Sequence, residues 1–296
     1  MMPILSPPLL VLAVLALDLA VGPLRSRIRL FPGVPVLLAR LALGLSWRLY
    51  RPRRGLRALR FRGALMVVWL AGFAALAGLG LAHVVAVLPA PYGTLLEAFV
   101  LWSCLRIARP LERLWQGGRA LRRGKSGEGS SAIEQTAVSF VHFVAVPVFW
   151  YLVAGLPGLF VAAAGWAVER AASSRNRGKK FGGFATRFQR VLSWIPSRIA
   201  EAIWALAALT VPRGRPVAAL LQGWRYAGAG DLAPIAAFAG GLGVAVPGPR
   251  KRAGPVWLGS GTARIGPRDI ARAMWLYFAA LLILGGILAF LGPIWP

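Results

Sequence analysis

The chain of 296 residues contains few of the side chains from which most enzyme sites are built. It has one cysteine, two histidines and nine acidic residues, against 35 lysines and arginines. The lone cysteine, Cys104, excludes a disulfide framework and a cysteine-based metal site. The sequence also has no Walker A or Rossmann glycine pattern and no His–Glu zinc motif. The scarcity of carboxylates therefore restricts the function more than any motif does.

The cationic residues are unevenly distributed. All 35 lie in five segments, 23–62, 106–125, 170–198, 213–225 and 250–272. A soluble protein mixes charge into each amphipathic element, whereas charge confined to loops between apolar spans is typical of a polytopic membrane protein. The composition, 57% hydrophobic with a mean hydropathy of +0.64, agrees with that class. The sequence therefore predicts an all-α polytopic integral membrane protein.

A net charge of +26 also occurs in nucleic-acid-binding proteins. Here the cations flank apolar spans and are nearly all arginine, so cytoplasmic loops facing anionic lipid explain them better. We therefore expect the lipid bilayer as a partner, and no nucleic acid. The positive-inside rule predicts a protein of the bacterial inner membrane with its basic loops in the cytoplasm.

About six to eight transmembrane or re-entrant helices are expected, within a single membrane domain at 1–296. Gly155-Leu-Pro-Gly158 should divide the long apolar stretch 132–168 into two helices joined by a tight turn. The short Gly-rich segment 232–247 is expected to re-enter the membrane or to cross it. The other expected spans are 4–22, 63–88, 94–107, 199–211 and 273–291.

The polar segments between these spans are predicted to face the cytoplasm. Residues 23–62 form a basic segment whose apolar stretch is suited to a helix in the membrane interface. Residues 109–131 are expected to form a flexible polar loop, and 169–198 and 248–272 to form basic loops. Within the third segment, the cations and small residues of 173–182 suit a phosphate or carboxylate ligand. A solvated loop near anionic lipid explains the same residues.

Ionisable residues inside apolar spans are candidates for function. Glu134 and His142 lie eight residues apart on one predicted helix, about 80° apart around its axis, so both can face one cavity. Alternatively, Glu134 favours the dipole at a helix start and His142 hydrogen-bonds inside the bundle. Asp18, near the inner end of the first span, is suited to pairing with a loop arginine. Asp231 and Asp269 lie near segment ends and are expected to pair locally.

Four groups of motifs follow one another in the middle of the chain and, in their order, resemble the CobD/CbiB family of cobalamin biosynthesis. The N-terminal Leu17-Asp18 and the C-terminal Arg268-Asp-Ile270 fit that family more loosely. The matching groups are Glu134-Gln-Thr-Ala137 with Val146-Pro-Val-Phe-Trp150, Ala154-Gly-Leu-Pro-Gly158, Phe181-Gly182 with Ala185-Thr-Arg187, and Ser193-Trp-Ile-Pro-Ser-Arg198.

This resemblance implies an ATP-dependent amide-forming ligase of corrinoid synthesis. Such a synthase joins adenosylcobyric acid to an aminopropanol, or its phosphate, to give adenosylcobinamide or its phosphate. ATP and Mg²⁺ are the implied cofactors, and a corrinoid is the implied substrate. Carried onto this chain, the resemblance makes Glu134 the remaining catalytic carboxylate. Arg187 and Arg198 would hold phosphate or corrinoid carboxylates, with Asp18 and His142 as further ligand-binding candidates.

The departures from the family pattern fall on polar residues. Val138, Ser139 and His142 stand where the family has Glu, Asn and Asp, and Gln189 and Arg190 replace a pair of Asp residues. Ligation of this kind needs carboxylates that hold Mg²⁺ against phosphates, and most of them are absent here. No metal-binding residues are therefore expected.

Two functions stay open on this sequence. One is a corrinoid synthase with impaired catalysis, which predicts acids clustered with arginines in a cavity facing the cytoplasm. The other is a non-catalytic partner or regulatory homologue, similar to the AmpE type, which acts on another membrane protein. That second function predicts a sealed apolar bundle with free polar loops.

Overall fold

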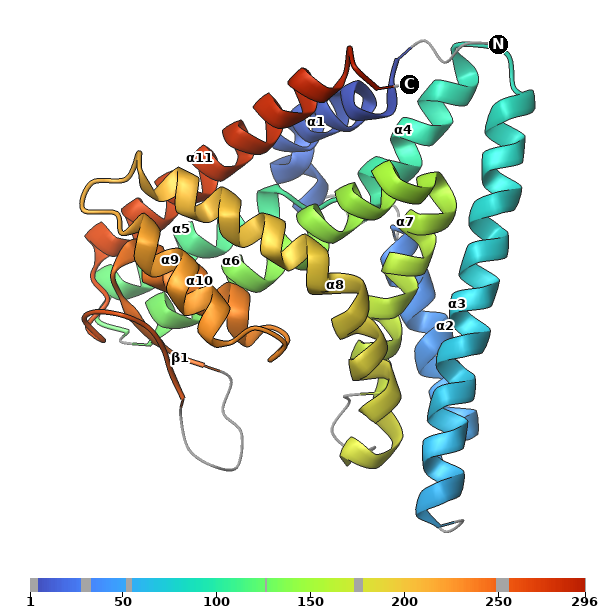
Figure 1. Ribbon diagram of the computed structural model, residues 1–296, viewed down its shortest axis with the longest axis horizontal. Coiled ribbons are helices and arrows are strands. Elements are labelled where there is room, and N and C mark those ends of the chain that lie inside the picture. The colour runs from blue at the N-terminus through green and yellow to red at the C-terminus, as the bar shows by residue number, and fades with distance from the viewer. Residues whose placement is uncertain are drawn as a thin grey trace. The chain divides into compact units, whose positions relative to one another are not determined.

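The computed structural model describes residues 5–27, 33–51, 55–125, 127–172, 178–248 and 256–295, and these residues are nearly all helical (Figure 1). This confirms the all-α prediction. The contacts within the chain group it into two compact units, and the single membrane domain expected from the sequence stays a prediction. The first unit comprises 1–14, 28–105 and 146–193, and the second comprises 15–27, 106–145 and 194–296.

The first unit is a helical bundle arranged around α7. This helix packs against α2, α3 and α4. Its core is made of small and branched apolar side chains, with Met66, Ala164 and Val168 fully or almost fully buried. The unit also contains the first part of α1 (Pro7–Arg27) and the first part of α8 (Gly178–Ala208). Its complete helices are α2 (Val34–Leu49), α3 (Leu56–Val87), α4 (Tyr92–Cys104) and α7 (Val146–Ala172).

The predicted division at Gly155-Leu-Pro-Gly158 is confirmed as a kink inside α7. Ala154 and Gly155 leave the helical conformation, and Gly155 has φ 59° and ψ −148°, which glycine adopts far more readily than other residues. The neighbouring helix α3 is fitted to this kink by Gly78. A Cβ atom added at Gly78 would lie 2.6 Å from Pro157 Cα. The kink and this glycine therefore determine how closely α3 approaches α7.

The second unit surrounds α10, which is buried from Ala233 to Leu242 and packs against α6, α9, α11 and the two strands. A cluster of aromatic rings from Phe140, Trp204, Phe238 and Tyr277 fills its interior, with centroids 5.2–5.7 Å apart. The antiparallel strands β1 and β2 pair next to α10. The elements of this unit are α5 (Ala108–Arg122), α6 (Glu128–Phe140), a π-helix (Val141–Ala145), α9 (Pro216–Arg225), α10 (Leu232–Leu242), β1 (Ala245–Pro247), β2 (Trp257–Gly259) and α11 (Pro267–Leu291), together with the ends of α1 and α8.

Among the described residues, three helical stretches are long and apolar enough to cross a membrane: Leu56–Val87, Glu128–Ala172 and Pro267–Leu291. Pro7–Gly22 and Leu232–Leu242 are shorter apolar helices. These findings support a membrane-embedded protein. With 11 residues, α10 is about 16 Å long, which is too short to cross a hydrocarbon core of about 30 Å. The expected span 199–211 is instead the end of the amphipathic helix α8, which carries Arg187, Arg190 and Glu201.

Two segments expected to be loops are largely helical. In place of a flexible loop at 109–131, α5 ends at Arg122 and α6 begins at Glu128. Residues 169–172 complete α7, and α8 begins at Gly178, so most of 169–198 is helix; residues 173–177 lie outside the described residues. The third basic segment, 248–272, contains β2 and the start of α11, and 249–255 are likewise not described. The cytoplasmic placement of these segments stays a prediction.

Candidate functional site

The second unit brings three ionisable side chains together where α6 and the π-helix meet α10. His142 Nε2 lies 2.8 Å from Asp231 Oδ1. The Glu134 and Asp231 carboxylates are close enough to repel one another. The structure thus pairs His142 with Asp231, and Glu134 on α6 lies within range of the charge of Asp231. That these three residues form a functional site stays a proposal.

The π-helix helps to position His142. A π-turn contains more residues than an α-turn and changes the directions of the side chains that follow, and such turns are frequent at functional sites. Here it comprises Val141–Ala145 and directly follows α6, which carries Glu134. The angle of about 80° expected for a regular helix therefore does not describe how the two side chains are arranged.

The histidine and its aspartate differ in burial. The side chain of His142 is 6% exposed, whereas that of Asp231 is 48% exposed. Asp231 precedes α10 but makes no side-chain capping hydrogen bond, and its carboxylate reaches the histidine instead. An ionised carboxylate only accepts hydrogen bonds, so this contact places a proton on Nε2. A ligand would approach this group from the side of Asp231.

Asp231 was not singled out from the sequence, where it was expected only to pair locally. Its partner is 89 residues away along the chain. The sequence did contain one indication that Asp231 could be functional. This acid follows the glycines Gly228 and Gly230 and immediately precedes a fully apolar segment. Ionisable groups next to such segments are candidates for function. Only tertiary structure could show which side chain it contacts.

Asp18 and Arg187, two further predicted ligand-binding residues, have other surroundings within their own units. Asp18 is 2% exposed, and its carboxylate accepts a hydrogen bond of 2.7 Å from the Ile107 N–H at the start of α5. It therefore helps to hold the fold of the second unit. Arg187 is exposed on the part of α8 that belongs to the first unit.

The guanidinium of Arg198 is already paired with a carboxylate of its own helix, α8. Its Nη2 donates to Glu201 Oε1 at 2.6 Å, its Nη1 donates to Gly223 O at 3.4 Å, and its guanidinium lies 5.9 Å from the Trp224 ring centroid. Glu201 is 2% exposed and lies outside the three long apolar stretches. Burial raises the pKa of Glu201 to about 7, although the charge of Arg198 acts to lower it. An external anion would have to displace Glu201 to reach Arg198.

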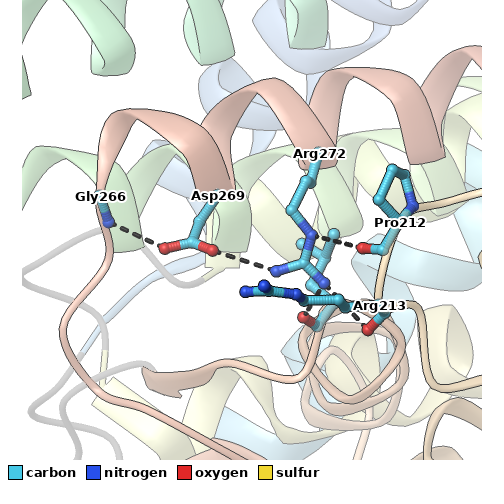
Figure 2. A network of polar contacts seen from close by, with 6 residues as sticks. Pro212, Arg213, Gly266, Asp269 and Arg272 are labelled. Atoms are coloured by element: carbon cyan, nitrogen blue, oxygen red, sulfur yellow. Dashed lines mark hydrogen bonds and ion pairs between the residues drawn. The ribbon is translucent and has the colours of Figure 1, made fainter.

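The motif around Arg268-Asp-Ile270 forms a structural network, shown in Figure 2. Asp269 Oδ2 accepts from the Gly266 N–H at 3.0 Å, and Asp269 Oδ1 accepts from Arg272 Nη1 at 3.1 Å. The Arg272 guanidinium also donates to the backbone oxygens of Pro212 and Arg213 at 2.9 and 3.1 Å. A further bond of 2.8 Å reaches the last carbonyl of α10. Arg272 therefore links three segments of the second unit.

In the described part of the chain, no group of three or more His, Cys, Asp or Glu side chains is placed to form an all-protein metal cage. Mg²⁺ at phosphate-transfer sites is usually held by one or two carboxylates together with substrate phosphates and water. Any Mg²⁺ at Glu134 and Asp231 would therefore take its remaining ligands from a bound substrate. The same two carboxylates also suit a ligand cation that forms hydrogen bonds.

Comparison with known proteins places these features in a family. A profile of the family described as CobD/Cbib protein matches residues 118–277, more than half of the chain. Three relatives, each named cobalamin biosynthesis protein CobD, come from Brucella anthropi, Brucella suis biovar 1 and Rhodobacter capsulatus. They are 32%, 30% and 30% identical to this chain over 187, 190 and 161 residues.

These alignments cover 55%, 56% and 52% of this chain and 53%, 54% and 51% of the respective relatives. The chain therefore spans about half the length of the curated relatives it matches. No solved structure matches it. The matched region contains the motifs from Glu134 to Arg198 as well as Asp231, and the match extends over more than half of the chain. The chain belongs to the CobD/CbiB family of cobalamin biosynthesis proteins.

Proposed function

We propose that the protein acts at a membrane step of cobalamin biosynthesis in which adenosylcobyric acid is joined to an aminopropanol or its phosphate. The product would be adenosylcobinamide or its phosphate. Membership of the CobD/CbiB family supports a role in cobalamin biosynthesis. The observation that carries the site is the grouping of Glu134, His142 and Asp231.

The electrostatics of this group suit the amine substrate. Two carboxylates that lie close together repel, and a cation bound to both relieves that repulsion. An aminopropanol carries such a cation, because its amine is protonated at neutral pH. Asp231, half exposed and held by His142, would receive the ammonium together with Glu134. His142 is in this scheme a positioning residue.

The same arrangement serves the bond-forming step. The corrinoid carboxyl group would first be converted into an acyl phosphate by the implied ATP, so that phosphate leaves as the C–N bond forms. The nitrogen must lose a proton before it attacks that carbonyl carbon, and a carboxylate within hydrogen-bond reach can accept the proton. Glu134 is the catalytic residue in this scheme. Arg187, exposed on the part of α8 in the first unit, is kept as a separate candidate for holding a phosphate or corrinoid carboxylate. Because Val138 and Gln189 stand where the family has acids, we expect catalysis to be impaired.

Amine binding by the full chain in lipid nanodiscs tests this site directly. Calorimetric titration with 1-amino-2-propanol should show binding, and 2-propanol, which lacks the amine, should show none. We expect Asp231→Asn and Glu134→Gln each to weaken binding at least tenfold. Glu128→Gln, at an exposed acid in the first turn of the same helix α6, is the matched control and should bind like the wild type. Wild-type affinity in both site variants would rule out the assignment.

A non-catalytic membrane partner or regulatory homologue is the second candidate. It is favoured by the pairing of Arg198 with Glu201, which occupies the arginine that an anionic substrate would need. In this role the retained scaffold would bind another membrane protein. Amine binding without turnover would fit this second function, so activity has to be measured as well as binding.

A further inference from the structure

The short helix α9 has two unlike faces, one of which is fixed inside the second unit. Ala219 and Gly223 are buried, and α9 packs along α10, its neighbour in Figure 1. The approach is close, because a Cβ atom added at Gly240 of α10 would lie 2.8 Å from the Ala218 carbonyl oxygen. Small residues allow this backbone contact. The orientation of α9 within its unit is therefore well defined.

The opposite face of α9 is apolar and exposed. Its side chains recur at intervals of three and four residues, which places them in one stripe along a helix. An exposed apolar stripe of this kind indicates a contact surface. The residues of the stripe and their exposed fractions are Val217 67%, Leu220 39%, Leu221 65% and Trp224 67%.

Arginines border the stripe at both ends. Arg213 and Arg215 precede α9, Arg225 is its last residue, and all three are exposed. The sequence between Glu201 and Asp231 contains no acidic residue. A partner of this surface therefore has to combine an apolar body with negative charge at its edge. A membrane containing anionic lipid has this combination, since guanidinium groups pair well with phosphates.

The length of α9 determines how it can meet such a membrane. Ten residues span about 15 Å, which is half of a hydrocarbon core of about 30 Å. Both ends carry arginine, and placing either end deep in hydrocarbon is costly. We propose that α9 lies flat in the membrane interface, with its stripe among the acyl chains and its arginines on anionic lipid headgroups. This in-plane anchor goes beyond the proposed activity and does not depend on it.

Depth measurements with spin labels test this orientation. The only native cysteine is Cys104, so single labels can be introduced into a Cys104→Ala background. The full chain is reconstituted in vesicles of phosphatidylcholine and phosphatidylglycerol, and accessibility to oxygen and to a water-soluble nickel complex gives each label's depth. Labels at Val217, Leu221 and Trp224 should all lie at the same depth, about 5–10 Å below the headgroups.

Labels on α3, which is long enough to cross the membrane, serve as the matched control. Leu65, Trp69 and Leu76 are exposed on that helix and should report depths that change along it. A similar gradient along α9 would show a re-entrant helix and overturn the proposal. Labels on α9 shielded from both oxygen and nickel would also overturn it, because the stripe would then be covered by protein.

The arginines are tested through the lipid composition. Omitting phosphatidylglycerol should move the Leu221 label towards water. In the triple variant Arg213→Gln, Arg215→Gln, Arg225→Gln the depth should no longer depend on that lipid. If the arginines are kept and the Leu221 label lies at the same depth with and without phosphatidylglycerol, binding of the arginines to the headgroups is contradicted.

Discussion

The pair formed by Arg198 and Glu201 shows how one acidic residue can change what an arginine is able to bind. The motif Ser193-Trp-Ile-Pro-Ser-Arg198 makes the arginine a candidate for binding an anion. The structure shows a carboxylate three residues further on already bound to it. The i, i+3 spacing suits such a pair on one helix, but the sequence placed Arg198 in a basic loop and Glu201 in the next span, so the pair was not expected. Gly223 leaves space for the pair, since an added Cβ atom would lie 2.5 Å from Glu201 Oε2.

A pH dependence of stability follows from this burial. Because the pKa of Glu201 is raised from 4.5 to about 7, the folded protein binds the proton more tightly than the unfolded chain does. Its contribution to stability is therefore complete below about pH 4.5, is lost as the pH rises towards 7, and is constant above that. Between about pH 4.5 and pH 7, the difference in unfolding free energy between the wild type and Glu201→Gln should therefore change with pH. Denaturant titrations of both proteins in detergent measure this difference. Parallel curves for the two proteins would contradict the raised pKa.

At the scale of helices and strands, local chemistry predicted the kink in α7 but not the helix α5. Gly155 and Pro157 act through their own backbone preferences, which can be read directly from the sequence. At 109–131 a polar sequence rich in glycine and serine suggested a loop, although Pro110, Leu114 and Gly117 of α5 form a buried stripe. That stripe gains its partners from α6 and α11, so tertiary packing makes this segment a helix.

The contact between α3 and the kink in α7 provides a matched pair of glycine substitutions. Gly78→Ala would force a Cβ atom against Pro157, and overpacking of this kind costs about 1–3 kcal/mol. Gly80 lies on the same helix with nothing within 4 Å of an added Cβ atom. Gly80→Ala should leave the thermal midpoint unchanged or raise it, because alanine has the higher helix propensity. Equal midpoints for the two variants would show that α3 does not approach the kink this closely.

The network of Arg272 makes a second prediction about how elements are held together (Figure 2). Arg272→Ala removes bonds to Asp269 and to three backbone carbonyls. Hydrogen bonds to a charged group contribute about 1.5–3 kcal/mol each and are not additive, so a loss of about 2–4 kcal/mol is expected. Arg268→Ala, at an exposed position one turn earlier on α11, is the control and should cost less than about 0.5 kcal/mol. Similar losses in denaturant unfolding would contradict the network.

At the scale of the whole molecule, charge distribution predicted the class of protein more fully than it predicted the site. Apolar stretches between basic segments predicted membrane helices, and α3 and α11 confirm that two such stretches are long apolar helices. For the site, periodicity related Glu134 to His142 because they are close in sequence. Asp231 could not be assigned to them, because the packing of α10 against α6 brings it there.

The orientation in the membrane stays a prediction and can be tested by chemical labelling. In a Cys104→Ala background, Tyr92→Cys at the start of α4 reports on the uncharged turn that precedes this helix. Lys125→Cys reports on the basic segment between α5 and α6. Both positions are exposed. With the basic segments in the cytoplasm, an impermeant maleimide should label Tyr92→Cys in right-side-out vesicles and Lys125→Cys only in inverted ones. Labelling of both from one side would contradict this orientation.

Complementation is the most direct test of the central claim, that the group around Glu134 and Asp231 serves corrinoid assembly. The gene is expressed in a bacterial host that lacks its own cobinamide-forming synthase, under conditions in which growth requires cobalamin. We predict that the wild type and Glu128→Gln support growth, and that Glu134→Gln and Asp231→Asn do not, at matched levels in the membrane. Growth of both site variants would contradict the assigned site. Failure of the membrane-inserted wild type to support growth would contradict the synthase function and favour a non-catalytic partner.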